Sequence, residues 1–188
     1  MSFHGFLSFS AIFGLLVISY SCTTPGGSSH EKGSDAALLL GEASLVPKNA
    51  SNIKGTVVFS RIEKGIRVVA QITGGTPGKL GIHIHEKGDC SAEDASSAGG
   101  HFNPTGNQHS GPHRQERHAG DLGNIPVEQD GSGLLKVDLP DLEAFSDWSA
   151  IVGKSVVVHE KQDDLKTQPS GDSGKRIACG TITASPAQ

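Results

Sequence analysis

The chain has 188 residues, of which 35% are hydrophobic and 19% charged, and its formal net charge is −4. This composition excludes a collagen and a disordered tail, and the length suits a single compact domain. The negative net charge argues against a general nucleic-acid-binding protein, which needs a basic face. Nine histidines is a high count and three cysteines an odd one, so both need an explanation.

The first 21 residues have the features of a signal peptide. No charged side chain occurs before Glu31, and a mostly apolar run extends from Phe6 to Ile18. Its thirteen residues suit the core of a signal peptide and are too few for a membrane-spanning helix, which needs about 20. The small residue Ser21 favours cleavage before Cys22. We therefore predict that residues 1–21 are removed on export.

Residues 22–35 form a predicted flexible tether rich in Gly, Ser and Pro. A cysteine at the new N-terminus before such a tether resembles a bacterial lipoprotein, although Ser19 stands where Leu is usual and the bulky Tyr20 follows it. Cys22 is therefore a lipidation candidate that would anchor the protein to a membrane. A plain secreted protein and an uncleaved signal anchor are the alternatives. We expect an exported protein of the periplasm or cell envelope, lipid-anchored if Cys22 is modified.

Residues 36–188 form the predicted domain, in which short apolar segments alternate with turn residues. Alternation of apolar and polar side chains, typical of half-buried strands, occurs from Ile66 to Thr73 and from Leu135 to Leu139. In chain order, the strand candidates are 37–46, 53–60, 66–73, 79–85, 119–124, 135–139, 151–159 and 177–183. No stretch has a convincing helical stripe. The sequence therefore predicts an all-β sandwich or barrel.

Two intervals do not fit strands, residues 86–118 and 160–176, which are polar and rich in Gly, Ser and Asp. Loops longer than about 12–15 residues in a compact domain are usually functional or disordered. Six of the nine histidines lie between residues 83 and 118, and most of these are in the first interval. This concentration favours a functional loop.

The pair His83 and His85 ends a strand candidate. Residues two apart on a strand point to the same face, so both imidazoles can reach one metal ion. Taken alone, the pair is equally compatible with two solvated surface histidines. The residues that follow it in the chain favour the metal site.

Further ligand candidates follow at short intervals. His101, His109, His118 and Asp121 are separated by eight, nine and three residues. Three imidazoles and one carboxylate make a tetrahedral set that suits zinc. His159 ends a strongly β-like run of valines and can return to the metal held by the first pair, where imidazoles alone suit copper or zinc.

Several longer motifs surround these residues. They are His83-Ile84-His85-Glu86, Gly100-His101-Phe102-Asn103-Pro104, Gly111-Pro112-His113, Arg117-His118-Ala119-Gly120-Asp121-Leu122-Gly123-Asn124, Val157-Val158-His159-Glu160 and Arg176-Ile177-Ala178-Cys179-Gly180. From about residue 37 to residue 184, the chain resembles the copper-zinc superoxide dismutase family, bacterial exported type. The resemblance implies an eight-stranded Greek-key β-sandwich or barrel with two long functional loops.

The resemblance also implies one copper and one zinc ion per subunit and a role for each motif residue. Copper would be held by His83, His85, His101 and His159, and zinc by His101, His109, His118 and Asp121. His101 would thus bridge the two ions. Asp163 would link His83 to His109 from outside the ligand set, and Arg176 would lie beside the copper. Cys90 and Cys179 would form a disulfide within the subunit.

The activity that the resemblance implies is an oxidoreductase, a superoxide dismutase for antioxidant defence in the cell envelope. Two superoxide ions and two protons would become dioxygen and hydrogen peroxide by redox cycling of copper, with Arg176 and His101 as catalytic residues. No nucleic-acid partner is expected. A homodimer is compatible with the sequence, which does not give the oligomeric state. The alternative is a non-catalytic envelope protein that binds copper and zinc.

Overall fold

The computed structural model describes residues 37–139 and 147–186. The predicted signal peptide, the predicted tether and the lipidation candidate Cys22 lie outside these residues. Within the described ranges, no helix combines the length and the hydropathy that crossing a membrane requires.

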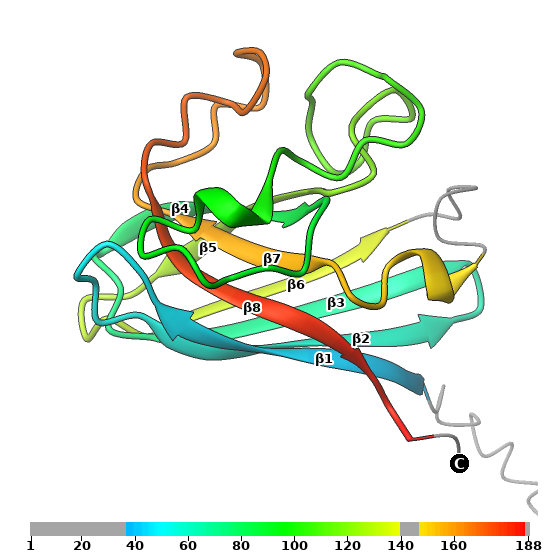
Figure 1. Ribbon diagram of the computed structural model, residues 1–188, viewed down its shortest axis with the longest axis horizontal. Coiled ribbons are helices and arrows are strands. Elements are labelled where there is room, and N and C mark those ends of the chain that lie inside the picture. The colour runs from blue at the N-terminus through cyan, green and yellow to red at the C-terminus, as the bar shows by residue number, and fades with distance from the viewer. Residues whose placement is uncertain (1–36, 140–146, 187–188) are drawn as a thin grey trace, which may run out of the picture. The chain divides into compact units, whose positions relative to one another are not determined.

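Eight antiparallel strands form a closed barrel (Figure 1). They are β1 (Leu38–Pro47), β2 (Lys54–Ile62), β3 (Gly65–Thr73), β4 (Gly78–His85), β5 (Asp121–Val127), β6 (Gly133–Leu139), β7 (Ser155–His159) and β8 (Arg176–Ala184). Around the barrel the order is β1-β2-β3-β6-β5-β4-β7-β8, with β8 pairing back to β1. The prediction of an eight-stranded all-β fold is confirmed.

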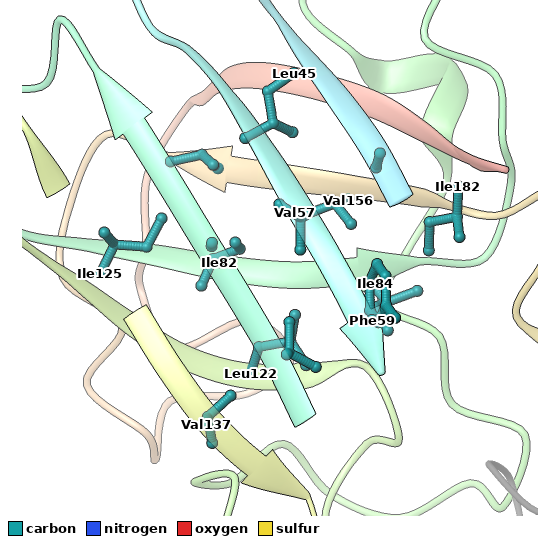
Figure 2. Close-up of a cluster of buried hydrophobic side chains, with 14 of the residues drawn as sticks. Leu45, Val57, Phe59, Ile82, Ile84, Leu122, Ile125, Val137, Val156 and Ile182 are labelled. Carbon is teal, nitrogen blue, oxygen red and sulfur yellow. The ribbon is translucent and has the colours of Figure 1, made fainter. Parts of the chain in front are cut away.

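The alternating apolar residues of the strands fill the inside of the barrel. On β3, Ile66, Val68 and Ala70 are fully buried, whereas Arg67 between them pairs with Asp138 on the outer face at 2.6 Å. Figure 2 shows the same inward arrangement for residues from several strands, with Val57 and Phe59 facing Ile82 and Ile84. Burial of such side chains contributes about 1.5–3 kcal/mol each, and this core provides the rigid base of the site.

From Leu80 onward, the strand β4 is buried on both of its faces. Ile82 and Ile84 belong to the barrel core, and the alternating His83 and His85 point to the opposite, outer face, yet both histidines are 0% exposed. The cover comes from the two long loops, residues 86–120 between β4 and β5 and residues 160–175 between β7 and β8, which lie on the same side of the barrel in Figure 1. The loops therefore enclose polar side chains on the outside of the barrel.

Two of the predicted strands begin two or more residues before the observed ones. The strand predicted for 151–159 begins at Ser155, because Asp147 accepts a hydrogen bond from the Ser149 N–H and starts the short 3-10 helix η2 (Trp148–Ala150). The strand predicted for 119–124 begins at Asp121 and continues to Val127. The Gly120 backbone instead bonds to Phe102 and to Ile84, which holds the loop against β4.

A disulfide joins Cys90, in the β4–β5 loop, to Cys179 on β8. Both cysteines pack with Val157 and with the short 3-10 helix η1 (Ser96–Ala98) through Ala98. The bridge closes a loop of 89 residues and fastens the longer loop to the barrel wall.

Replacing both bridged cysteines by alanine is expected to lower the free energy of unfolding. For a closed loop of this length the chain-entropy relation gives about 4–5 kcal/mol. Urea unfolding of the metal-free protein measures the difference, with Cys22→Ala as the control for thiol loss elsewhere. A change within the roughly 0.5 kcal/mol of an ordinary surface substitution would contradict the proposed stabilising role.

Candidate metal centre

The outer face of β4, the end of β7 and the two loops bring one group of four imidazoles together. The ligand atoms of His83, His85, His101 and His159 all lie within 4.8 Å of one another. His101 reaches the group from the β4–β5 loop, whose backbone forms an isolated bridge with His85. The His85 and His159 Nε2 atoms are 3.5 Å apart.

Hydrogen bonds leave one free ring nitrogen on each of these histidines. His85 Nδ1 donates to the Gly99 carbonyl at 2.9 Å, and His159 Nδ1 donates to the Gly174 carbonyl at 3.2 Å. These bonds leave both Nε2 atoms as lone-pair donors toward the group. His83 Nδ1 and His101 Nε2 are buried and have no hydrogen-bond partner among the described residues. Buried polar nitrogens without partners are costly, and a copper or zinc ion in this all-imidazole group would satisfy them.

A second group of donor atoms surrounds the carboxylate of Asp121 at the start of β5. Asp121 Oδ1 lies 3.0 Å from His101 Nδ1, 3.0 Å from His109 Nδ1 and 3.4 Å from His118 Nδ1. The His101 and His118 Nδ1 atoms are also 3.4 Å apart. Four ligands in a tetrahedron at zinc distances of about 2.0–2.1 Å are separated by roughly 3.3 Å, so this group fits zinc.

Distance alone also groups His83 with His101, His109 and Asp121. However, His83 Nε2 is occupied by a hydrogen bond to Asp163, and its one free nitrogen, Nδ1, belongs to the all-imidazole group. His118 is therefore the better fourth member of the zinc-type group. His109 Nδ1 lies 3.0 Å from Asp121 Oδ1, but the two atoms are not aligned for a hydrogen bond. This is the arrangement expected of two ligands that bind the same cation.

Asp163, in the β7–β8 loop, connects the two groups. Its Oδ2 accepts from His83 Nε2 at 2.9 Å and its Oδ1 accepts from His109 Nε2 at 2.9 Å, and the side chain is fully buried. The Asn124 amide holds the Asp163 backbone, because Nδ2 donates to the Asp163 carbonyl at 2.9 Å and Oδ1 accepts from its N–H at 2.8 Å. Such outer partners fix the orientation of ligand rings.

Burial keeps most of the histidines neutral. It lowers the pKa of His85 and His159 well below the ordinary value, and neighbouring imidazoles add to the shift. Burial also lowers the pKa of His101 to about 4, although its hydrogen bond to Asp121 opposes the change. These rings are therefore neutral at pH 7, which is the form that binds metal ions.

His109 is the exception among these imidazoles. Burial alone would lower its pKa, but the contacts with Asp121 and Asp163 raise it to about 9. Burial alone would raise the pKa of both carboxyl groups, but their histidine partners hold these pKa values well below the usual range. In the metal-free chain a protonated His109 thus supplies positive charge between two carboxylates, where a cation would otherwise supply it.

Arg176, at the start of β8, lines a cavity of about 420 Å³ together with His85, His101 and His159. Its Nη1 donates to the Ala95 carbonyl at 2.7 Å, which orients the guanidinium from the disulfide-bonded loop. Burial lowers the pKa of Arg176 from its high ordinary value, with the nearby Asp94 opposing the change. A positive group with further N–H donors therefore borders the same cavity as the free imidazole nitrogens.

Six of the predicted ligand candidates lie in the two groups of donor atoms defined by distance, and His118 joins them through its 3.4 Å distance to Asp121. Asp163 and Arg176 lie beside them, and His113 is exposed. Sequence reasoning missed three supporting groups: the Asn124 amide, the Ala95 carbonyl and Arg117. The Arg117 side chain is buried and donates through Nη1 to the carbonyls of His118 and Ala119, at 2.7 Å and 3.0 Å. Both Arg117 and Asn124 lie within a motif quoted above, but spacing gave no indication of these contacts.

We predict that binding of zinc to the metal-free protein releases about one proton at pH 8, because His109 must lose its proton to become a ligand. The apparent affinity for zinc should rise about tenfold per pH unit from pH 7.5 to 9 and level off above the His109 pKa of about 9. Calorimetry in two buffers of different ionisation enthalpy measures the number of protons released on zinc binding.

The matched variant for this experiment is Asp163→Asn, which removes one of the two carboxylates on the His109 ring. In this variant the His109 pKa should be lower, so the apparent affinity for zinc should stop rising at a lower pH. If zinc binding releases no proton at pH 8 in the unmodified protein, the charge state assigned to His109 is wrong.

Comparison with known proteins places these residues in context. A family model described as copper/zinc superoxide dismutase matches residues 53–182. An extracellular Cu-Zn superoxide dismutase of Caenorhabditis elegans is 39% identical over 153 residues, which cover 78% of this chain and 67% of that protein. The Cu-Zn superoxide dismutase 2 of Mesembryanthemum crystallinum is 39% identical over 149 residues, 75% of this chain and 94% of that protein.

The similarity also includes a protein of a different name. A copper chaperone for superoxide dismutase from Rattus norvegicus is 36% identical over 160 residues, which cover 81% of this chain. The matched region spans only 57% of the length of that chaperone.

Proposed function

Because the chain belongs to the copper/zinc superoxide dismutase family, we propose that it is an active superoxide dismutase. The reaction converts two superoxide ions and two protons to dioxygen and hydrogen peroxide. The observation that carries this proposal is the position of His101. Its Nδ1 lies in the group that fits zinc, and its unpartnered Nε2 faces the group that fits copper, at a cavity that Arg176 also lines.

We assign copper to His83, His85, His101 and His159, and zinc to His101, His109, His118 and Asp121, one ion of each per subunit. Copper, when bound, would supply the electron exchange, because it alternates between two oxidation states and zinc does not. His83 and His109 would be held in orientation by Asp163, which accepts a hydrogen bond from each at 2.9 Å. The ligand rings therefore need little rearrangement during turnover.

His101 Nε2 is the proton-carrying atom in this proposal. While Nδ1 stays in the zinc group, Nε2 can take up a proton and donate it to the reduced product at the cavity. Arg176 would attract the superoxide anion and hold it by N–H donors, since a guanidinium stays charged at any physiological pH. The Ala95 carbonyl fixes the guanidinium position for this role.

The direct test is superoxide-dependent activity of the purified protein loaded with both metals. Activity should disappear when copper is removed and return with copper but not with zinc alone. A second candidate, a non-catalytic copper- and zinc-binding protein, is suggested by the similarity to a copper chaperone. A protein that holds both metals in full and has no activity would contradict the enzyme and favour this second candidate.

Substitution of Arg176 by alanine should lower kcat/KM about ten- to a hundredfold and weaken its dependence on salt, with copper and zinc contents unchanged. The range follows from the loss of hydrogen bonds to a charged group. Arg176→Lys keeps the charge but lacks the planar guanidinium, so its kcat/KM should lie between those of Arg176→Ala and the unmodified protein. Arg61→Ala on β2 is the control for loss of one positive charge. Unchanged kcat/KM of Arg176→Ala at low salt would exclude the assigned role.

We also propose that the protein is exported. The disulfide supports this proposal, because such bonds persist in oxidising compartments, and so does the relative described as extracellular. Periplasmic location, lipidation of Cys22 and a homodimer are further parts of the proposal. Mass spectrometry of the mature N-terminus tests the lipid, and an unmodified Cys22 would exclude it.

A further inference from the structure

A short segment of the β7–β8 loop, residues 167–171, contacts His109 at both of its ends. At the first end the side-chain amide of Gln168 pairs with the His109 backbone. Its Oε1 accepts from the His109 N–H at 2.7 Å, and its Nε2 donates to the His109 carbonyl at 2.9 Å. Nε2 also donates to the Lys166 carbonyl at 3.0 Å, which fixes the orientation of the amide.

At the second end the Gly171 backbone lies against the hydrogen bond between His109 and Asp163. A Cβ at Gly171 would overlap Asp163 Oδ1 and would lie 2.8 Å from His109 Nε2. The φ of +66° at this residue also favours glycine. The Gly171 N–H donates to the Thr167 carbonyl at 2.6 Å, so the segment is closed into a turn. The turn is therefore hydrogen-bonded to His109 at one end and lies close to the His109 ring at the other.

Pro169 and Ser170, between these two anchor points, line the same cavity as Arg176. The β7–β8 loop, all of it described, contains no strand or helix, so side-chain contacts add to a few backbone hydrogen bonds in setting the position of this wall. The side-chain hydrogen bonds of Asp164 are local, to the Lys166 and Thr167 N–H groups, and its N–H donates to the Gly171 carbonyl at 2.9 Å. In the stretch 164–170, all of it described, Gln168 alone has a side-chain hydrogen bond that reaches the β4–β5 loop.

We propose that Gln168 is a positioning residue that couples the zinc ligand His109 to the cavity wall formed by Pro169 and Ser170. Zinc bound to His109 would restrict the position of that residue, and the Gln168 amide, paired with the His109 backbone, would then restrict the turn. Because the turn contains Pro169 and Ser170, the cavity wall would be restricted as well. The inference rests on the proposed function, because that function assigns zinc to His109 and superoxide to the cavity. Gln168 itself touches neither group and acts through the His109 backbone.

The test compares Gln168→Ala with Gln162→Ala, an exposed glutamine of the same loop whose side chain makes no hydrogen bond in the described residues. The readout is hydrogen exchange of the amides of Thr167, Gln168, Ser170 and Gly171, measured by mass spectrometry with and without zinc. In the unmodified protein zinc should slow this exchange. In Gln168→Ala the factor by which zinc slows exchange should be about ten times smaller, as expected for the loss of two net hydrogen bonds. Gln162→Ala should behave as the unmodified protein.

Two further measurements separate positioning from general damage to the fold. The absorption spectrum of Co²⁺ bound in place of zinc should be the same in both variants, because the ligands are intact. For the enzyme with both metals, KM should rise in Gln168→Ala with kcat within about twofold. Gln168→Glu keeps the shape but sets a carboxylate against the His109 carbonyl, so its exchange should resemble that of alanine.

Unchanged exchange in Gln168→Ala, or an equal change in Gln162→Ala, would overturn the inference. A changed Co²⁺ spectrum would also overturn it, because Gln168 would then act on the ligand set itself. Exchange and cobalt binding need no catalysis. If the protein proves to have no dismutase activity, the proposed function fails while these two readouts still decide the role of Gln168.

Discussion

Each ring nitrogen of His101 faces a different group of donor atoms, and the placement of this imidazole constrains both groups. Its Nδ1 lies 3.0 Å from Asp121 Oδ1, and its Nε2 is buried among the histidines of β4 and β7. His101 belongs to the β4–β5 loop, so this loop must return to β4, where it forms the bridge with His85. The Cys90–Cys179 disulfide and the backbone contacts of Gly120 hold it there. The β4–β5 loop is therefore fastened to the barrel at several points around the imidazole that faces both groups.

The buried polar cluster is unfavourable unless cations complete it. Four imidazoles with lowered pKa values lie beside two ionised carboxylates. Within the part of the chain that the structure describes, His83 Nδ1 and His101 Nε2 have no hydrogen-bond partner. Burying unpaired polar groups costs free energy, and ions that bind only the folded state return it as stability. The apolar barrel beneath the cluster is complete without any metal, which explains how a closed fold can present such a site on its outer face.

Much of the architecture can be predicted from the sequence, because strand periodicity and turn residues are local signals. The face shared by His83 and His85 follows from their spacing on a strand, and the two polar intervals mark the loops. Contacts between the loops are different. Gln168 and His109 are 59 residues apart and meet only because both loops fold over the same face of the barrel. No local pattern specifies this contact. The predicted start of β7 at residue 151 is also wrong, because Asp147 begins a short 3-10 helix and the strand starts only at Ser155.

The proposed sharing of His101 by two metal ions can be tested by anomalous diffraction at the copper and zinc absorption edges, from crystals of the protein loaded with both metals. We expect a copper peak bounded by His83, His85 and His159 and a zinc peak bounded by His109, His118 and Asp121. His101 should lie between them, with Nε2 toward copper and Nδ1 toward zinc. A single peak, or two peaks with His101 facing only one of them, would contradict the shared ligand.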